Sequence, residues 1–584
     1  RVRLPVRPDH HPRTLAMSGV ARDTATVRLA LPDDIDPARS RLSVNLGSSP
    51  LAIIRGARDR MRVYPYFCTE QVISTALPLI ALYRAGQQRG GGPLVRGDPR
   101  GQIESAVAVI ASRQRADGGI GYWGSADWTS PWLSAYAGLL LLDARSAGVT
   151  VNDSVLARLA NYLSTDLHNP APVVSPVAHW YSNRSTRLAD RVAAVDFLSR
   201  LGRPDVAAEN ELLALARQLA WEDRLRLGEV LARRGASRAA QGLIAPAWAQ
   251  VKLEGNRATI PDSVHSEFYF HSRVRPVARL LTATLAVAPT HELVGPLVET
   301  LAQHARAGML FWSTQDEGSL VWALAEFDRR QRSAAARGVS VRAGNRVLLR
   351  AGAGSEGEGA DSTVALSGLL RDRAGGGKEL SLSIDSDGGE GVVYYSLAVR
   401  AVPLQRPVRP VDEGIQVERW YERFDSRTPI TSAAEGELVR VRLRITVPAD
   451  RQFVVLDDPL PAGLEAVDLS LRTAAQLPGP GTAVRDADER AEQGSGERWD
   501  YGSWDSGWWS PFDHKEIRDD RVVYFATVLW KGTYGAMYVA RATTPGVFVR
   551  PPAHAEEMYN PGVHGESDGG VFEVRAMRGE GRVW

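Results

Sequence analysis

Cysteine is almost absent from this chain of 584 residues, because Cys68 is the only one. A single thiol cannot form a disulfide within the chain, and it excludes a zinc site built from several cysteines. The sequence also lacks a His-Glu-x-x-His run, the signature of many zinc metalloproteases. We therefore expect no metal and no cofactor.

Long apolar runs and an excess of one charge are lacking as well. No stretch of about 18 apolar residues occurs, so the sequence predicts no membrane-spanning helix. The formal net charge of +2 argues against a nucleic-acid partner. The chain starts at Arg1 without a signal peptide. We expect it to be the C-terminal part of a longer protein whose targeting signal lies upstream.

The single cysteine lies in the run Tyr64-Pro65-Tyr66-Phe67-Cys68-Thr69-Glu70-Gln71. The spacing lets the Cys68 sulfur reach the side-chain carbonyl of Gln71 across one tight turn. Loss of ammonia would then close an internal thioester. A thiol, with a pKa of about 8.5, is a far better leaving group than an amine, so the Gln71 acyl group would become a stored electrophile. The alternative is a buried free cysteine that packs as a small hydrophobe.

The run resembles the Cys-x-Glu-Gln thioester motif of the α2-macroglobulin and complement superfamily. It is most similar to the bacterial α2-macroglobulin branch, in which Tyr-Pro-Tyr precedes the cysteine. Thr69 departs from the pattern, since vertebrate members have glycine there and many bacterial members have leucine. Other segments that resemble this branch lie at 114–123, 132–137, 313–316, 457–463, 512–516, 518–521, 540–546 and 551–559.

Hydrophobic periodicity divides the chain into a β block, a helical block and further β segments. Strands are predicted at 1–6, 24–31 and 41–46, and again at 347–349, 363–369, 380–384 and 391–402. Between them, apolar residues recur at three- and four-residue spacing. This spacing predicts helices at 103–113, 131–145, 155–164, 187–200, 209–219, 222–234, 277–287, 292–306 and 319–332. A helical block bounded by strands on both sides indicates an insertion into one β-domain.

The pattern and the resemblance together predict a multidomain α and β protein. An all-α toroid (α/α) thioester domain at 51–336 would be inserted in a split β-sandwich CUB domain formed by 1–50 and 337–406. A C-terminal macroglobulin-like β-sandwich would follow at 407–584. Its strands are predicted at 437–447, 521–529 and 535–544, a linker at 403–410 and a mobile loop at 477–496.

The resemblance implies a broad-spectrum protease inhibitor that traps attacking endopeptidases. Amino-terminal macroglobulin domains and a bait region of the same protein would lie outside this chain. After activation, the Gln71 carbonyl would acylate a lysine amine of the protease and Cys68 would leave as thiolate. Such a trap acts once, so we do not expect an enzyme. The resemblance places it in the bacterial periplasm or cell envelope, where an absent N-terminal lipid anchor would provide the only membrane attachment, as in an inner-membrane lipoprotein.

A stored thioester must be protected from water. Tyr64, Tyr66 and Phe67 directly precede the cysteine and are placed to cover it. The resemblance implies that the terminal domain packs a methionine or an aromatic residue over the bond. Met558 and Tyr559 are the candidates from their position near the chain end, and the alternative is that both are plain core residues.

Two further polar residues are candidates for the site. Ser175-Pro176-Val177-Ala178-His179 resembles the run that carries a transfer histidine in relatives with hydroxyl acceptors, so His179 is a candidate transfer catalyst. The opposing interpretation is a loop histidine without a chemical role; His265 and His271 are weaker candidates. Glu70 would hydrogen-bond backbone amides of the turn or be solvated.

Two other classes of protein compete with the inhibitor. An α-toroid enzyme such as a terpenoid cyclase needs a carboxylate-rich motif in its helical domain, but the cluster at 33–36 lies in the β segment. A thioester adhesin would bind host or surface amines covalently and need no protease. The Gly-x-Ser-x-Gly pattern at 565–569 is rejected as a nucleophile elbow, because a strand rather than a helix is predicted after it, at 571–574.

Overall fold

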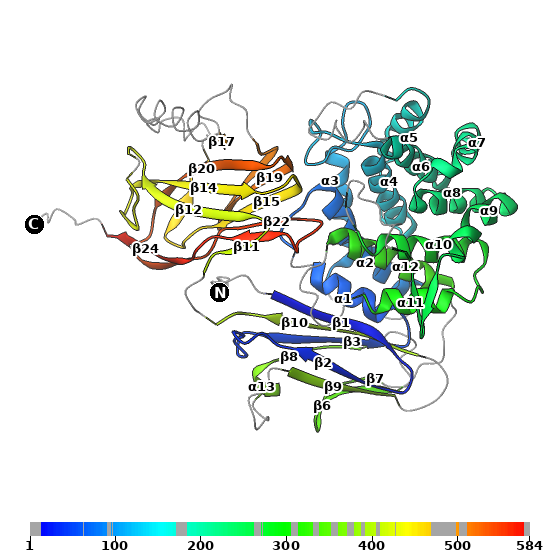
Figure 1. The fold of residues 1–584 in the computed structure, drawn as a ribbon, viewed down its shortest axis with the longest axis horizontal. Helices are drawn as coiled ribbons and strands as arrows, with labels where there is room; N and C mark the ends of the chain where they lie inside the picture. Colours follow the sequence, from blue (N-terminus) through cyan, green and yellow to red (C-terminus); the bar gives the residue numbers. More distant parts are fainter. Residues whose placement is uncertain are drawn as a thin grey trace, which may run out of the picture. The chain divides into compact units, whose positions relative to one another are not determined.

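The chain forms two compact units in a computed structural model (Figure 1). One unit contains residues 12–402, and the other contains residues 1–11 and 403–584. Among the described residues, no helix combines the length and the apolar character needed to cross a membrane. The predicted strand at 1–6 and the predicted loop at 477–496 lie outside the described residues. The structure describes residues 13–61, 64–89, 95, 97–170, 184–261, 270, 272–304, 313–330, 338–351, 360–370, 379–386, 392–404, 409–426, 428–468, 498–500 and 511–576.

Two four-stranded sheets in the first unit share one hydrophobic core. The first has the order β1 (Arg13–Ala21), β10 (Val393–Ala401), β3 (Arg41–Gly47) and β8 (Ala360–Ala365). The second has the order β2 (Thr24–Ala30), β9 (Glu379–Ser386), β6 (Val339–Ala343) and β7 (Arg346–Ala351). Strands from before the helical block thus pair with strands from after it, as an insertion requires.

One predicted strand in this region is wrong at its end. The strand predicted at 363–369 stops at Ala365, and α13 (Ser367–Leu370) is a short helix. Leu366 and Leu369 are both buried in the core. Side chains three residues apart share a face in a helix but not in a strand, which explains the change.

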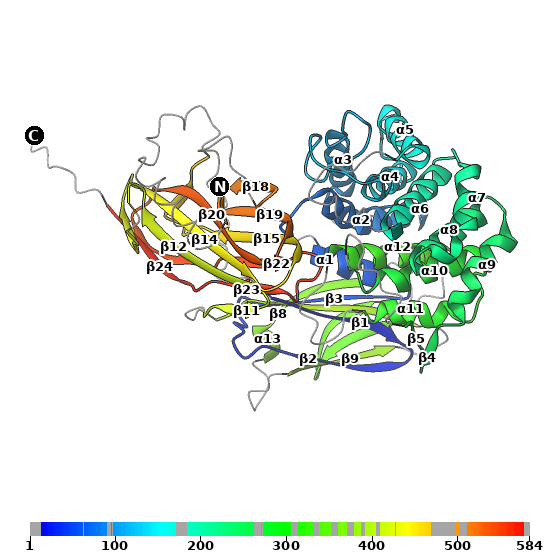
Figure 2. The same cartoon turned by 45° about the horizontal axis from the view of Figure 1, so that its top comes forward.

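The helical block between these strands closes into a ring. α2 packs on α4, α4 on α6, α6 on α8, α8 on α10, α10 on α12, and α12 returns to α2. The other helices pack on the ring helices, and α1 and α11 contact the sheet that contains β1 (Figure 2). The helices are α1 (Leu51–Met61), α2 (Thr69–Arg89), α3 (Pro99–Ser112), α4 (Pro131–Ser146), α5 (Asp153–His168), α6 (Arg184–Arg200), α7 (Val206–Ala214), α8 (Trp221–Arg233), α9 (Ser237–Trp248), α10 (Arg275–Val287), α11 (Val294–Ala302) and α12 (Thr314–Arg330).

The starts of α3 and α4 follow from short sequence signals. Ser130 accepts a hydrogen bond from the Leu133 amide at the start of α4, and Asp98 accepts one from the Gly101 amide at the start of α3. Each cap is followed by a proline, whose fixed φ suits the first helical position. The helix predicted at 209–219 is shorter, because α7 ends at Ala214 and a 3-10 turn (Ala216–Gln218) follows. A two-stranded sheet of β4 (Lys252–Glu254) and β5 (Arg257–Thr259) was not predicted.

The second unit is built from β-sheets around its own core. The six-stranded sheet has the order β11 (Val411–Glu413), β23 (His564–Glu566), β22 (His554–Glu557), β15 (Arg451–Pro459), β19 (Arg521–Leu529) and β18 (His514–Arg518). A five-stranded sheet contains β12 (Gln416–Arg423), β14 (Leu438–Val447), β20 (Gly532–Ala542) and β16 (Leu464–Ala466), with β17 (Arg498–Asp500) also on β20. A three-stranded sheet has the order β13 (Ser432–Ala434), β24 (Gly570–Arg575) and β21 (Gly546–Arg550).

The alternation predicted for 437–447 is present in β14, with one difference. The apolar face lies in the core, but Arg440 and Arg442 on the opposite face are also buried, with 1% and 6% exposed. Glu422 of β12 lies 3.8 Å from both Arg440 and Arg442, so the buried guanidinium groups have a counter-charge. The prediction that a strand follows 565–569 is confirmed by β24, which rules out a nucleophile elbow there.

Candidate functional site

The candidate site lies where the chain enters α2. Cys68 directly precedes the helix, and its carbonyl accepts the first helical hydrogen bond from the Val72 amide at 2.9 Å. Residues three apart share one face of a helical turn, which brings Cys68 and Gln71 together. Both are fully buried, and the Cys68 amide donates a hydrogen bond to Gln71 Oε1 at 2.9 Å. A helix start also favours negative charge, such as that of a thiolate.

Tyr64 contacts the nitrogen of the Gln71 side-chain amide. Gln71 Nε2 donates a hydrogen bond to the Tyr64 hydroxyl at 3.1 Å. The Tyr64 and Tyr66 rings meet edge to face with centroids 5.4 Å apart, a favourable aromatic geometry. Tyr66 is buried, whereas Phe67 is 49% exposed and gives less cover than predicted. The structure therefore brings Tyr64, Tyr66, Cys68 and Gln71 into one cluster.

Thr69 ties this cluster to the turn at 114–123. Its amide donates to the Tyr122 carbonyl at 2.8 Å, and its hydroxyl donates to the Gly121 carbonyl at 2.6 Å. Arg113 donates to the Thr69 hydroxyl at 3.1 Å and to the Phe67 carbonyl at 2.7 Å. The residue that departs from the family pattern therefore has a defined structural role, because its hydroxyl bridges the helix start and the turn.

Glu70 is fully buried, so the solvated alternative is wrong. Its carboxylate accepts hydrogen bonds from Thr314 Oγ1 and Gln315 Nε2, both at 2.7 Å, and from the Ser74 hydroxyl. Burial raises the pKa of the neighbouring Tyr136 hydroxyl, and the Glu70 charge adds to this rise. A buried carboxylate needs such donors, so Glu70 fixes the first turn of α2 to the first turn of α12.

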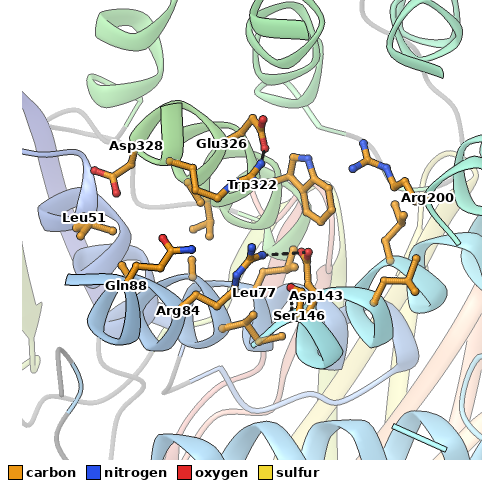
Figure 3. Close-up of a pocket in the computed structure, with 18 of the residues that line it drawn as sticks. Leu51, Leu77, Arg84, Gln88, Asp143, Ser146, Arg200, Trp322, Glu326 and Asp328 are labelled. Carbon is orange, nitrogen blue, oxygen red and sulfur yellow. Dashed lines mark hydrogen bonds and ion pairs between the residues drawn. The ribbon is translucent and has the colours of Figure 1, made fainter. Parts of the chain in front are cut away.

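A cavity of about 340 Å³ lies elsewhere in the helical ring (Figure 3). It is lined by the C-terminal halves of α2, α4 and α12. Arg84 lies about 20 Å along α2 from Gln71, from the usual rise per residue. Arg84 points toward Asp143, with 3.4 Å between Nη1 and Oδ1. Glu326 pairs with Arg329. These ion-paired carboxylates do not resemble the acid cluster of a cyclase.

The other predicted site residues stay predictions. His179, His265 and His271 lie outside the described residues. Met558 and Tyr559 are buried and belong to the second unit. The Met558 amide donates to the Phe453 carbonyl at 3.0 Å, and the Tyr559 ring meets the Phe453 ring edge to face. Phe453 has a φ of 52°, a left-handed conformation that is rare for an aromatic residue. Among the described residues, no three His, Cys, Asp or Glu side chains are arranged to hold a metal ion.

Comparison with known proteins finds similarity to bacterial alpha-2-macroglobulins. The sequence-family model described as the bacterial alpha-2-macroglobulin MG10 domain matches residues 414–562. An alpha-2-macroglobulin of Xylella fastidiosa (strain Temecula1) is 26% identical over 97% of this chain. The chain is thus similar to bacterial alpha-2-macroglobulins over almost its whole length. It spans 31% of the length of this relative.

Solved structures of alpha-2-macroglobulins have the same fold. The native Escherichia coli protein, from domain MG7 to the C-terminus, matches with a TM-score of 0.74 and 22% identity. The match covers 97% of this chain and 83% of that one. Salmonella alpha-2-macroglobulin reacted with methylamine also matches with a TM-score of 0.74 and 22% identity, over 98% of this chain and 34% of that one. The mixed arrangement of several β-sheets and many helices is therefore that of the C-terminal region of an alpha-2-macroglobulin.

Sequence reasoning missed the donors around Glu70. The run Ser-Thr-Gln-Asp at 313–316 resembles a family motif, but the sequence alone predicts no role for it. In the structure, Thr314 and Gln315 of this run bind Glu70, and Asp316 accepts hydrogen bonds from Ser272 and the Arg273 amide. One signal in the sequence could have found this contact. The Cys-x-Glu-Gln run, with Glu70, and the Ser-Thr-Gln-Asp run occur in the same chain, and hydroxyl and amide side chains are suitable donors to a buried carboxylate.

Proposed function

We propose that this chain carries an internal thioester between Cys68 Sγ and Gln71 Cδ and is the covalent-capture region of a broad-spectrum protease inhibitor. The hydrogen bond from the Cys68 amide to Gln71 Oε1 carries the proposal, because it holds the acyl group against the cysteine in a buried turn. Similarity to proteins named alpha-2-macroglobulin supports the inhibitor over the adhesin. The capture experiment described below distinguishes the inhibitor from the adhesin.

The chemistry of capture follows from the bond. A lysine amine of an attacking endopeptidase adds to the Gln71 acyl carbon, an amide bond forms, and the carbon–sulfur bond breaks. Cys68 leaves as a thiolate, and the amine proton goes to solvent. No step regenerates the thioester, so the protein acts once and is not an enzyme. Burial of Cys68 and Gln71 excludes water until the domains move.

The architecture agrees with this function. The closed helical ring fits an α/α-toroid thioester domain at 51–336, and the paired strands around it fit a CUB domain split between 1–50 and 337–406. The second unit fits the terminal macroglobulin-like domain at 407–584. We propose that Met558 and Tyr559 shield the thioester and that His179 catalyses transfer of the Gln71 acyl group. The bait region and the other macroglobulin domains would belong to the rest of a periplasmic or envelope protein.

Intact mass and alkylation of Cys68 test the proposal. We expect a mass short by one ammonia and a Cys68 that resists alkylation. Methylamine should add its own mass and free one thiol. A mass gain of deamidation size at Gln71 also supports the bond, because it shows that a thioester formed and was hydrolysed. A freely alkylated Cys68 with the unmodified sequence mass would overturn the proposal.

Capture itself needs a second measurement. Incubation of the full-length protein, which includes the bait region, with trypsin should give a covalent adduct that survives denaturing electrophoresis, and Cys68→Ala in that protein should give none. The lysine-blocked form of the protease is the matched control, because it keeps the protein surface but removes the amine. An intact thioester that couples to amine-coated surfaces but never to an attacking protease would favour the adhesin.

A further inference from the structure

We propose that Tyr64 is a catalytic residue of thioester closure, in which its hydroxyl gives a proton to the Gln71 amide nitrogen, which leaves as ammonia. The inference rests on the proposed function, because it requires that Cys68 and Gln71 react with each other. It goes further by assigning Tyr64 a chemical step, in addition to the covering role that its position predicts.

The Gln71 side-chain amide makes one hydrogen bond through its oxygen and another through its nitrogen. Its oxygen accepts the Cys68 amide hydrogen at 2.9 Å, and its nitrogen contacts the Tyr64 hydroxyl at 3.1 Å. Attack on an amide carbon places negative charge on the oxygen and makes the nitrogen basic. The Cys68 amide is therefore placed as a donor to the developing oxyanion. The Tyr64 hydroxyl is placed at the atom that must gain a proton.

The closure step balances within these groups. The Cys68 sulfur loses its proton and forms a bond to Gln71 Cδ. The bond from Cδ to Nε2 then breaks, and the nitrogen leaves as ammonia with its own two hydrogens and one further proton. Tyr64 supplies this proton, and the proton released by the thiol restores the hydroxyl through solvent. No oxidant, metal or other reactant is needed.

The Tyr64 ring is held for such a role. Its edge-to-face contact with the Tyr66 ring restricts where the hydroxyl can lie. A fixed donor at the leaving group typically contributes a factor of roughly 100 or more to a rate. The same hydroxyl must act in reverse when an amine opens the thioester, because it then accepts the proton that the attacking nitrogen loses.

The rate of thioester opening distinguishes a Tyr64 that transfers a proton from a Tyr64 that only shields the bond from solvent. A residue that only shields the bond would, when altered, let methylamine in and speed the opening. A residue that transfers the proton would, when altered, slow the opening. Tyr64→Phe keeps the ring and removes only the hydroxyl, so the two roles predict opposite changes for this one variant.

The experiment compares the wild-type protein, Tyr64→Phe and the control Tyr395→Phe, a tyrosine of β10 outside the cluster. Opening by methylamine is followed by intact mass. Closure is followed after opening with ammonia, which restores the Gln71 amide, and removal of the ammonia. We expect both rates to fall roughly 100-fold in Tyr64→Phe and to change little in Tyr395→Phe. A Tyr64→Phe protein that melts like wild type, contains no thioester and keeps an unmodified Gln71 amide would support the same conclusion.

Three results keep the two proposals distinct. A wild-type protein that never shows the mass deficit overturns the proposed function itself. A wild-type thioester with unchanged or faster opening in Tyr64→Phe overturns only the role of Tyr64. The wild-type closure rate in heavy water needs no variant. It should be lower than in ordinary water, and an equal rate would count against proton transfer in the slow step.

Discussion

Arg60 and Glu317 form a buried ion pair between the last turn of α1 and the first turn of α12. Arg60 donates to Glu317 through Nε at 2.7 Å and through Nη2 at 2.9 Å, and the two side chains are 2% and 1% exposed. Arg60 lies upstream of the Tyr64–Cys68 segment, and Glu70, which binds Thr314 and Gln315, lies downstream. The first turn of α12 thus holds the Tyr64–Cys68 segment at both ends.

Breaking this pair should destabilise the first unit strongly. Glu317→Gln leaves the Arg60 charge buried without its counter-charge, and such changes cost about 3–5 kcal/mol in the free energy of unfolding. Chemical denaturation followed by circular dichroism measures the loss. Glu104→Gln is the control, because Glu104 pairs with Arg100 at an exposed position and should give no measurable change. Equal midpoints for the two variants would contradict the prediction.

Glu70→Gln should loosen the helix start. A glutamine places an NH2 group where the carboxylate now receives three donors, so at least one buried donor loses its acceptor, at a cost of about 1–3 kcal/mol. We expect a lower melting temperature and faster opening of the thioester by methylamine. Thr314→Val removes one donor and keeps the shape, so its effect should be smaller. A Glu70→Gln protein with wild-type melting and opening rates would show that the carboxylate is dispensable.

The sequence predicted a helical block that starts at about residue 51, but α1, α2 and α9 were not among the helices named in it. Two of the three have a physical reason. α2 has Pro78 in its interior and α9 has Pro246, and proline normally marks a helix end. In the structure, α2 is held by its packing on α12 and α4. Tertiary packing therefore outweighs the local signal, as it does in most protein helices.

Local sequence also predicts only part of the candidate site, namely the contacts between residues close together in the chain. The spacing from Cys68 to Gln71 predicts that these two residues meet within one turn, and the hydrogen bond from the Cys68 amide to Gln71 Oε1 agrees with it. Glu70 finds Thr314 and Gln315 more than 240 positions away, and no local pattern specifies such a contact. Only the closure of the helical ring, which brings α12 back to α2, makes this part of the site.

Gly121→Ala should disturb the turn that holds Thr69. A Cβ at Gly121 would lie 1.9 Å from the Gly124 carbonyl oxygen, so the backbone must shift. The Gly121 carbonyl accepts the Thr69 hydroxyl, and the shift therefore reaches the helix start. Overpacking of this kind costs about 1–3 kcal/mol. We expect a lower melting temperature and faster opening of the thioester by methylamine.

Gly124→Ala is the matched control in the same loop. A Cβ at Gly124 meets no atom within 4 Å, so stability and opening rate should stay at the wild-type level. If both alanine variants behave alike, close packing of Gly121 does not position Thr69.

Asp223 should make the stability of the first unit depend on pH. Burial in the first turn of α8 raises the pKa of its carboxyl to about 7, and the Glu222 charge adds to the rise. Arg226, Arg275 and Arg279 act in the opposite direction. In the unfolded chain an aspartate has a pKa of about 3.9.

The sign follows from counting protons. Between about pH 4 and pH 7 the native state keeps a proton on Asp223 that the unfolded state has released. The free energy of unfolding therefore falls as the pH rises through this range, and the contribution is constant below and above it. Asp223→Asn, which does not titrate, should lose this slope and gain stability relative to wild type as the pH rises. Urea denaturation at several pH values checks this, with Asp153→Asn, whose side chain is 93% exposed, as the control. An Asp223→Asn protein that keeps the wild-type slope would mean that another group controls the pH dependence.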